Sequence, residues 1–552
     1  MSERSHWGWG YAGKFPSAAE RADMADAIGS LLSIEPPEPQ APVSLADATV
    51  SAPRVSLPAE LAAFATQDRE ARIRHTYGRA YPDLVRGFRG DFSVAPDVVG
   101  LPREEAHIAA LVAWATAEQV AVIPWGGGTS VTGGVEGRVG EGWRGVMALD
   151  MCHMSAVLEV DATSLAVRVQ AGCRGPALEA ALAPHGLTLR HFPQSFEFST
   201  VGGWVATRAG GHFATLYTHI DDLVQSVRMW TPTGVWESRR LPGSGAGPSP
   251  DRLALGSEGT LGIITEVWLR VRPRPRFRAA ASVHFSTFAQ GAEAARAMSQ
   301  SRLYPANCRL LDPTEAMLNG VAMDGSAVLL LGFESAEHPL DAWIDRAVAI
   351  TVAHGGTCPD GIRRRDDGAG VARDDAAGTW RQAFFEAPYM QNVMVSLGIL
   401  ADTFETACTW ADFPALDRAV REAVRTAMGE RCGGGQVSCR FTHVYPDGPA
   451  PYYTWLAPAD PAQSLAQWEH VKRAASDALL ANGATITHHH AVGRTHMPWY
   501  LQQRPAPFGA ALQAAKQAVD PAGLLNPGVL VPDRHATDAN SAPGTIDEDG
   551  RG

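Results

Sequence analysis

A glycine-rich segment at residues 124–134 has the composition of a phosphate-binding loop. It reads Pro-Trp-Gly-Gly-Gly-Thr-Ser-Val-Thr-Gly-Gly and follows the apolar run 120–123, which predicts a buried strand. Glycines adopt positive φ readily and let consecutive N–H groups point into one concavity. Such a nest can bind a phosphate or pyrophosphate without a lysine. Thr129 and Ser130 add hydroxyl donors.

Two familiar phosphate loops do not fit this segment. A nucleoside-triphosphatase loop would close with Lys-Ser or Lys-Thr, and no such pair is present in residues 124–134. The Gly-x-Gly-x-x-Gly spacing is also missing, and glycines at 140 and 142 stand where a dinucleotide-fold helix should begin. On this segment alone, a surface turn without a ligand stays an open alternative.

Three further segments mix glycines with hydroxyl, amide and apolar residues: 193–211, 256–265 and 526–528. One such loop is weak evidence for a ligand. The opening loop and the first two of these follow one another within residues 124–265, which indicates a long ligand held by the main chain at many points.

The later half of the chain contains groups that could move protons or bind an anion. The run His488–His490 can offer hydrogen-bond donors or positive charge to a phosphate and can shuttle protons. In an extended segment His488 and His490 would share one face while His489 points the opposite way. We expect no metal, because no carboxylate or other ligand spacing accompanies the triplet.

Size and composition limit the class of protein. A chain of 552 residues exceeds one ordinary core and predicts two or more domains. Its net charge of −12 argues against nucleic acid as a partner. Seven scattered cysteines without a C-x-x-C pair, and a first segment without an apolar signal core, favour a cytoplasmic protein with reduced thiols.

Hydrophobic patterning predicts alternating helices and strands. Residues 101–115 predict a helix with Ile108, Leu111, Val112 and Ala115 on its buried face. We also expect a strand at 120–123, a strand pair at 157–160 and 165–169, and a helix at 176–184. The polar run that begins at 363 predicts a mobile surface loop, with a lid over a site as the alternative.

Several segments together resemble a known family. They are the loop at 124–134, PQSFEFSTVGGWVATRAGG at 193–211 and GSEGTLGIITE at 256–266, with Trp-Gly-Trp-Gly at 7–10, Phe-Glu-Thr at 404–406, SCRFTHVY at 438–445 and THHHAVG at 487–493. The chain resembles the vanillyl-alcohol-oxidase (PCMH-type) FAD flavoproteins. Within them it resembles the alkyldihydroxyacetonephosphate synthase (alkylglycerone-phosphate synthase) branch.

The resemblance implies an α+β fold. It consists of a PCMH-type (VAO-like) two-subdomain FAD-binding domain and a C-terminal α+β cap domain with an antiparallel sheet. The expected division is an N-terminal extension and helical region at 1–91, the FAD-binding domain at 92–274, the cap and a C-terminal FAD-contacting segment at 275–534, and a disordered tail at 535–552.

The resemblance also implies the cofactor contacts. By motif, FAD would contact Pro124, Trp125, Gly126, Gly127, Gly128, Thr129 and Ser130 with its pyrophosphate, and Pro193, Gln194, Ser195, Phe196, Glu197, Phe198, Ser199, Ala206, Thr207, Arg208, Ala209, Glu258, Gly259, Thr260, Leu261, Gly262, Ile263 and Ile264 with the remainder. Thr129 and Ser130 stand where the wider family often carries an attaching histidine, so the FAD is expected to be non-covalent.

In this branch the acyl group of acyl-dihydroxyacetone phosphate is exchanged for a fatty alcohol in ether-lipid synthesis, through a flavin N5 adduct and loss of a C1 proton. Tyr452 matches the family tyrosine, which nearby cations would help to act as a base. His488, His489 and His490 match its histidine triplet, and Arg309 a functional arginine. One departure is Gln391, which stands where the family has a substrate-binding arginine and should weaken affinity for an anionic group.

Two other functions stay open. A 2-hydroxy-acid dehydrogenase or oxidase of the same fold would carry a G-H-x-G-D-G-N-x-H segment and an E-H-G motif, whereas the chain has His443-Val444-Tyr445-Pro446-Asp447-Gly448-Pro449 and His489-His490-Ala491 there. A catalytically silent flavin- or lipid-binding protein is the other. For a synthase we expect a small-molecule lipid substrate, a homodimer and peripheral membrane contact, although no basic amphipathic anchor is visible.

Overall fold

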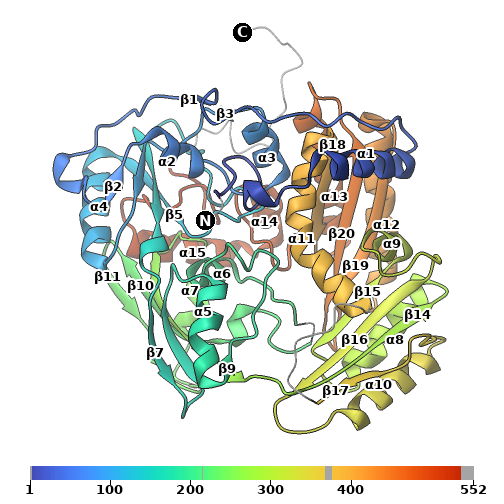
Figure 1. Cartoon of the computed structure of the whole chain (residues 1–552). Coiled ribbons are helices and arrows are strands. Elements are labelled where there is room, and N and C mark those ends of the chain that lie inside the picture. The colour runs from blue at the N-terminus through green and yellow to red at the C-terminus, as the bar shows by residue number, and fades with distance from the viewer. Residues whose placement is uncertain (1–2, 214, 367–375, 536–552) are drawn as a thin grey trace.

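The computed structural model describes residues 3–213, 215–366 and 376–535. It shows two halves side by side, each built around its own β-sheets and carrying helices (Figure 1). The α+β fold class with an antiparallel sheet in the second half is confirmed. No described helix is both long and apolar enough to cross a lipid bilayer.

The first half comprises short helices and mostly short strands. In chain order its elements are η1 (Ala12–Lys14), α1 (Ala18–Leu32), β1 (Thr49–Val50), η2 (Ala59–Leu61), β2 (Ala65–Thr66), α2 (Arg69–Arg74), α3 (Tyr81–Phe88), β3 (Asp91–Phe92), β4 (Val98–Gly100), α4 (Glu105–Glu118), β5 (Val120–Trp125), β6 (Gly145–Asp150), η3 (Met151–His153), β7 (Val157–Asp161), β8 (Ala166–Gln170), α5 (Gly175–Leu182), η4 (Ala183–His185), β9 (Leu187–Thr188), α6 (Val201–Thr207), η5 (Ile220–Asp222), β10 (Val224–Thr231), β11 (Gly234–Glu237), α7 (Pro250–Ala254), β12 (Ile263–Arg270) and β13 (Arg272–Pro273).

The second half contains the longer strands and helices. Its elements are β14 (Phe277–Phe285), α8 (Phe288–Gln300), β15 (Asn307–Leu311), α9 (Pro313–Leu318), β16 (Ala327–Ser335), α10 (Asp341–Ala353), β17 (Arg363–Arg365), α11 (Ala376–Ser396), β18 (Ile399–Glu405), α12 (Phe413–Cys432), β19 (Gln436–Val444), β20 (Pro449–Pro458), α13 (Ser464–Ala481), α14 (Met497–Gln503) and α15 (Ala506–Val519).

Two sheets organise the first half. Strands β4, β6 and β5 run parallel, and β2 adds to the edge of β4 in the antiparallel sense. The second sheet has the order β11-β10-β12-β8-β7 and is antiparallel throughout. The strand β5 ends at Trp125 and therefore delivers the chain directly into the glycine-rich loop.

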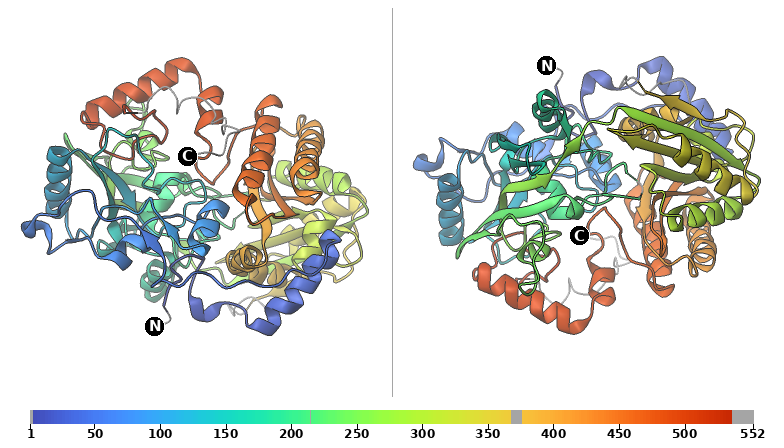
Figure 2. Two further views of the ribbon diagram at one scale, coloured as in Figure 1. Left: turned by 90° about the horizontal axis from the view of Figure 1, so that it is seen from above. Right: turned by 90° about the horizontal axis from the view of Figure 1, so that it is seen from below.

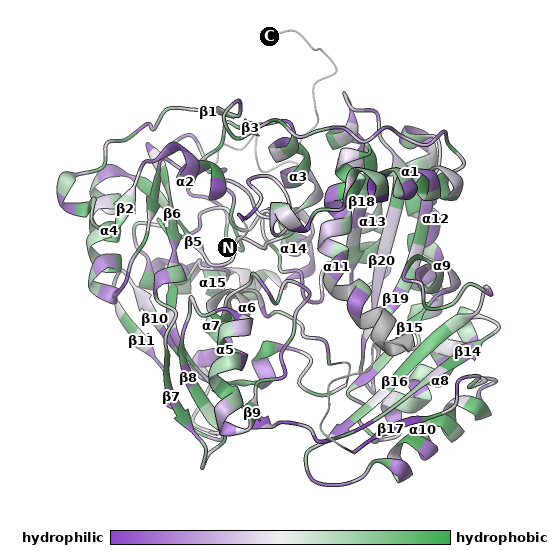
Figure 3. Ribbon diagram, viewed as in Figure 1, coloured by the Kyte–Doolittle hydropathy of each residue, from purple (hydrophilic) through white to green (hydrophobic). Residues whose placement is uncertain are grey.

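A seven-stranded antiparallel sheet forms the cap, in the order β17-β14-β16-β15-β19-β20-β18. Residues 327–331 of its strand β16 are buried, and β14 and β16 are coloured largely as hydrophobic in Figure 3. A strand buried on both sides is expected to be continuously apolar rather than alternating. Helices α8 and α10 lie together against the β14–β16 end of this sheet, and α12 and α13 pair beside β18–β20 (Figure 1).

The N-terminal helix α1 packs on the second half of the molecule, and the C-terminal helix α15 packs on the first half. Ile28 of α1 belongs to a buried cluster with Val393 and Leu397, which lie in and directly after α11 of the cap. Leu512 of α15 joins the apolar core of the five-stranded sheet. Figure 2 shows the red C-terminal helices covering the first half and the blue N-terminal helix beside the cap. The two halves are therefore tied together by both ends of the chain.

The predicted helix and strand pair are present, although the helix spans Glu105–Glu118 and so begins later than the predicted residue 101. The four apolar residues of the predicted helical stripe are buried on α4, and β7 pairs with β8 in the antiparallel sense. The loop prediction at 363 was wrong for its first three residues, because Arg363–Arg365 form β17 and pair with β14. Residues 367–375 of that loop, and residues 536–552 of the predicted tail, lie outside the described residues. The division at 274 stays a proposal.

Candidate active site

Glycine-rich segments from separate parts of the first half line one cleft with about 670 Å³ of empty space, counting its open mouth. Its lining residues are Pro124, Trp125, Gly126, Ser130, Gly134, Val135, Met151, Ala171, Thr200, Gly202, Gly203, Ala206, Thr207, Glu258, Gly259, Gly262, Ile263 and Ile264. Most of these residues are glycine, small or apolar, so main chain and apolar surface dominate the wall.

Glycine is required where the loops meet. A Cβ on Gly127 would lie 2.1 Å from the carbonyl oxygen of Phe198, and one on Gly126 would lie 2.4 Å from the hydroxyl of Thr200. Gly259 has a φ of +74° and its Cβ would lie 2.7 Å from the ring of Pro124. Real Cβ atoms do not approach other atoms this closely. The glycines therefore let three loops approach one another closely around the cleft.

Glu258 connects the cleft to the C-terminal part of the chain. Its carboxylate accepts hydrogen bonds from the backbone N–H groups of Val492 and Gly493, both at 2.9 Å. The amide of Asn526 donates to the carbonyl oxygens of Gly134 and Glu258. Burial raises the pKa of Glu258 to about 7. Segment 526–528 thus supports the cleft wall through the hydrogen bonds of Asn526 to two residues that line it.

The structure brings only part of the predicted cofactor set to the cleft wall. Gly127, Gly128, Thr129, Pro193, Gln194, Ser195, Phe196, Glu197, Phe198, Ser199, Arg208, Ala209, Thr260 and Leu261 do not line it. Glu197 instead pairs with Lys14 at 2.9 Å, and Arg208 pairs with Asp221 at 2.8 Å. The phenyl ring of Phe198 packs against Tyr11. These residues join the cleft wall to the N-terminal segment and to η5.

Several lining residues carried no role in the sequence prediction: Gly134, Val135, Met151, Ala171, Thr200, Gly202 and Gly203. Thr200, Gly202 and Gly203 stand inside a segment that the sequence had singled out, so a signal for them existed. Met151 and Ala171 follow strands β6 and β8, and only the tertiary packing places them at the cleft.

The histidine triplet wraps around one buried carboxylate. Glu405, the last residue of β18, accepts the backbone N–H groups of His488, His489 and His490 at 2.7–3.2 Å. The hydroxyl of Thr487 donates to the same carboxylate at 2.5 Å. Burial raises the pKa of Glu405, but the donors and imidazoles around it outweigh this effect and hold that pKa well below its ordinary value. Glu405 is therefore an anion in a nest of N–H groups.

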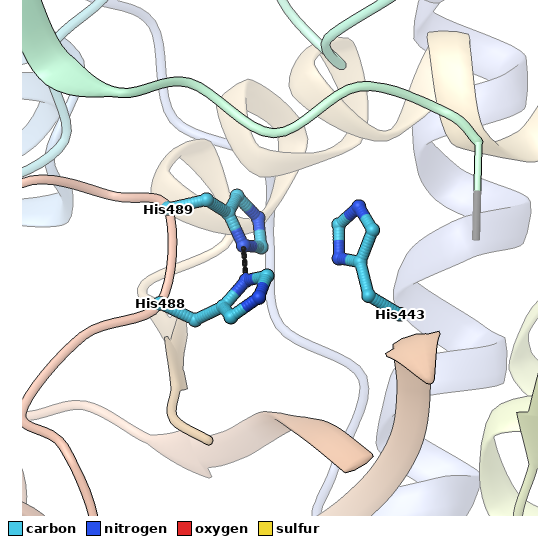
Figure 4. A group of neighbouring side chains, drawn as sticks. All are labelled: His443, His488 and His489. Atoms are coloured by element: carbon cyan, nitrogen blue, oxygen red, sulfur yellow. Dashed lines mark hydrogen bonds between the residues drawn. The ribbon is translucent and has the colours of Figure 1, made fainter. Parts of the chain in front are cut away.

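This nest changes the side-chain arrangement expected for an extended segment. The prediction that His489 points away from His488 was wrong, because the backbone curls around Glu405 and the two rings share a hydrogen bond of 3.0 Å between their Nδ1 atoms. Figure 4 shows these rings facing the ring of His443, which comes from β19. Burial lowers the pKa of His488 and His490, so both rings are neutral at pH 7.

One ring nitrogen from each of His443, His488 and His489 lies within 4.8 Å of the others, as a metal site would require. Five of these six ring nitrogens already have protein hydrogen-bond partners, namely Gly211 and Thr442 for His443, and His489, Tyr445 and His219 for the pair on the loop. The cluster is thus satisfied as a hydrogen-bonded group of imidazoles, and we assign no metal to it.

Tyr452 of β20 lies beside this cluster. Its ring packs 5.4 Å from that of His490 and stands 3.9 Å below the guanidinium of Arg440, and its hydroxyl donates to Thr403 at 2.9 Å. The nearby cation Arg440 favours the phenolate, as expected, but burial outweighs it and raises the pKa of Tyr452. At neutral pH Tyr452 is a hydrogen-bond donor.

The two candidate anion-binding residues lie in different surroundings. Arg309 of β15 is buried, donates to the carbonyl oxygen of His212 at 2.8 Å and lies close enough to Arg440 for the two charges to repel. Burial and that repulsion lower the pKa of Arg309 to about 9, so it stays a cation. Gln391 of α11 accepts from the indole N–H of Trp9 at 3.0 Å and donates to Ala401. Gln391 therefore holds the N-terminal segment against the cap.

Comparisons with known proteins agree with this architecture. A family model described as FAD binding domain matches residues 96–238, and one described as FAD linked oxidases, C-terminal domain, matches residues 274–530. Alkyldihydroxyacetonephosphate synthase from Dictyostelium discoideum is 30% identical over 482 residues, which cover 84% of this chain and 78% of the relative. Glycolate oxidase subunit GlcD from Bacillus subtilis is 26% identical over 79% of this chain and 89% of the relative.

A solved structure of an alkyldihydroxyacetonephosphate synthase superposes with a TM-score of 0.76 at 25% identity, and covers 95% of this chain and 98% of that one. The chain thus has an FAD-binding domain, and the cleft fits that cofactor. Its walls are main chain and glycine, which suit a pyrophosphate. Trp125, Met151 and Ile264 offer apolar surface suited to an aromatic ring system.

Proposed function

This chain belongs to the alkyldihydroxyacetonephosphate synthase family, and on that premise we propose that it exchanges the acyl group of an acyl-glycerone phosphate for a fatty alcohol. The proposed substrates are a phosphorylated acyl ketone and a long-chain alcohol. The reaction forms an ether bond without net oxidation. FAD, when bound non-covalently, would supply covalent catalysis at its ring, while the chain itself binds the substrate and moves its protons.

One observation carries the proposal: a single loop joins the cofactor cleft to the imidazole cluster. Between residues 487 and 493 the backbone donates first to Glu405 of the cap and then to Glu258, which lines the cleft. Two buried glutamates thus fix both ends of this loop. The histidine triplet is held at the junction of the two halves, where a substrate lying against the cleft would meet it.

The charges of the cluster suit a phosphorylated substrate. The guanidinium of Arg309 lies near His443. Arg440 lies near Arg309 and is already paired with Glu315 at 2.8 Å. We propose that Arg309 attracts the phosphate group, because a guanidinium forms charge-assisted hydrogen bonds that favour phosphate.

The proton roles follow from the protonation states. Because burial keeps Tyr452 protonated, we propose that it donates a hydrogen bond to the substrate carbonyl or to the leaving carboxylate. An imidazole nitrogen with a lone pair can accept the C1 proton, so we assign that role to the histidine triplet. His489 is the best candidate, because its side chain is 16% exposed and thus the most accessible of the triplet.

A transfer assay on the FAD-loaded protein tests this function. We expect exchange of fatty acid for fatty alcohol on an acyl-glycerone phosphate, without oxygen consumption. Tyr452→Phe should lower kcat by about 100-fold or more while the flavin spectrum is kept. Tyr453→Phe is the matched control, because this neighbour points to the opposite face and stacks on Phe404, and it should keep its activity.

The alternative is an FAD-linked oxidation of a 2-hydroxy acid, which the more distant similarity to a glycolate oxidase subunit suggests. The same preparation distinguishes the two functions. Rapid flavin reduction by a small hydroxy acid, with no exchange of fatty alcohol, would refute the synthase proposal. Equal loss of activity in the Tyr452 and Tyr453 variants would refute the role given to Tyr452.

A further inference from the structure

Three imidazoles form a continuous hydrogen-bonded chain that leaves the histidine triplet and ends in the other half of the molecule. The Nδ1 atoms of His489 and His488 are 3.0 Å apart, and the Nε2 atoms of His488 and His219 are 3.1 Å apart. His219 stands directly before η5 of the first half. Its Nδ1 lies 3.0 Å from the carbonyl oxygen of Arg208. The sequence analysis gave His219 no role.

The carbonyl end of this chain fixes the first tautomer. A carbonyl oxygen only accepts, so His219 must carry its proton on Nδ1. The Nε2 of neutral His219 is then an acceptor, and the proton shared with His488 must come from the Nε2 of His488. Burial lowers the pKa of His219 and of His488, which keeps both rings neutral with one proton each. His488 therefore presents a lone pair on Nδ1.

The contact with the carboxylate of Glu405, at the opposite end of the three imidazoles, leads independently to the same set of tautomers. Glu405 is an anion and only accepts, and the Nδ1 of His489 lies 3.3 Å from its Oε2. His489 must therefore carry its proton on Nδ1, which also satisfies the lone pair of His488. The contacts of Tyr445 are compatible with these tautomers. Its hydroxyl oxygen lies 2.7 Å from the Nε2 of His488 and can accept the Nε2–H, while its own O–H can donate to the hydroxyl of Thr218 at 3.1 Å.

This assignment leaves the Nε2 of His489 as a lone pair. In the described part of the chain, no hydrogen-bond partner is recorded for that atom, whereas both nitrogens of His488 and of His219 are engaged. A carboxylate that orients an imidazole through its Nδ1–H and leaves Nε2 basic is the arrangement expected of a general base.

We propose that Glu405 and the Arg208 carbonyl lock His489, His488 and His219 into one directional proton relay, with His219 as the terminal proton store. This inference rests on the proposed function for its substrate proton. The C1 proton moves to Nε2 of His489, the Nδ1 proton of His489 moves to Nδ1 of His488, and the Nε2 proton of His488 moves to Nε2 of His219. His219 ends as an imidazolium, no electrons are transferred, and the reverse sequence returns the proton.

The surroundings of His219 can support that temporary charge. The groups that face it are Arg208 at the end of α6, Asp221 of η5, His191, His443 of β19 and His489 of the loop. Asp221 favours the imidazolium, while Arg208 and the other imidazoles oppose it. Because burial lowers the pKa of His219, this residue holds the extra proton only briefly, as a reversible relay requires. Glu405, Arg208 and His219 are positioning residues, since they act through His489.

Nitrogen NMR of histidine-labelled, FAD-loaded protein without substrate tests the relay without relying on activity. Difference spectra against His219→Gln and His488→Gln would assign the signals. We expect an Nδ1–H tautomer for His219 and for His489, and an Nε2–H tautomer for His488. An Nε2–H tautomer at His219, or an Nδ1–H tautomer at His488, would overturn the proposal even if the enzyme proved to be a synthase.

Kinetics of His219→Gln provide the second test. The glutamine oxygen can still accept from His488 but cannot store a proton, so kcat should fall about 100-fold while KM and flavin content stay unchanged. One ionisation should also vanish from the acid side of the pH profile of kcat. His284→Gln, which changes a histidine of β14 that contacts Ser326, should leave activity unchanged.

Unchanged kcat and an unchanged pH profile in His219→Gln would refute the relay. A wild-type protein that fails to exchange acyl for alkyl groups while showing the expected tautomers would refute the proposed function alone. Stoichiometric zinc binding by the wild-type protein that is lost in His488→Gln would refute the relay in favour of a metal site.

Discussion

The replacement Glu405→Gln tests the idea that one buried carboxylate organises the histidine loop. The change keeps the size of the side chain but replaces one of its acceptor oxygens with an NH₂ donor. Glu405 is 2% exposed, and its Oε1 accepts from Thr487, His489 and His490 while its Oε2 accepts from His488 and His489. The glutamine would keep its oxygen on the Oε1 side and turn its NH₂ group towards the backbone N–H of His488.

The expected cost follows from these contacts. Charge-assisted hydrogen bonds are worth about 1.5–3 kcal/mol each, and a buried N–H left without an acceptor costs about 1–3 kcal/mol. Replacing the carboxylate removes the charge assistance from the remaining bonds and leaves the His488 N–H facing a donor. We therefore expect Glu405→Gln to reduce the free energy of unfolding by about 3–5 kcal/mol at pH 7, in the range known for breaking buried charged pairs.

The pH dependence has a defined sign. The pKa of Glu405 is lowered in the folded protein, whereas an unfolded glutamate titrates at about pH 4.3. The stabilisation is therefore fully present above about pH 4.3 and is lost as the pH falls through the lower folded-state pKa. The difference between wild type and variant should be constant from pH 7 to about pH 5 and should narrow below that.

Urea unfolding of the FAD-loaded proteins, followed by tryptophan fluorescence, measures this difference. Glu430→Gln is the matched control: Glu430 is exposed and pairs with His470 at the surface, so its replacement should cost less than about 1 kcal/mol. A loss below about 1 kcal/mol for Glu405→Gln, or a loss that grows as the pH falls below 4, would show that the nest does not hold an ionised carboxylate.

Two other replacements test separate contacts. Gly127→Ala should clash with the carbonyl of Phe198, cost about 1–3 kcal/mol and lower the flavin absorbance per protein, whereas Gly243→Ala, with open space around it, should change neither quantity. Gln391→Arg removes the acceptor for the indole N–H of Trp9, so a thermal melt should show a loss of about 1 kcal/mol and a transfer assay should show no gain on the phosphate substrate. A Gln391→Arg variant that is stable and more active would contradict this prediction and would indicate that residue 391 contacts the substrate.

Local sequence determined a large part of this architecture. Helix α4 and the strand pair β7–β8 were predictable because each has a short-range hydrophobic period and nearby turn residues. The cleft was predictable as a ligand site because glycine changes the accessible backbone conformations wherever it stands. The FAD-binding fold and the family were likewise visible in contiguous motifs.

Other features were decided by contacts between residues far apart in the chain. An isolated run of three histidines predicts alternating faces, but Glu405, more than eighty positions earlier, curls the loop and turns two rings together. Desolvation, which sequence does not report, keeps Tyr452 protonated against the charge of Arg440. The pairing of His219 with His488 needs both halves of the molecule. The sequence thus supplied the reactive groups. Burial and long-range hydrogen bonds set the protonation states and orientations of these groups, because they depend on neighbours that only the folded chain brings together.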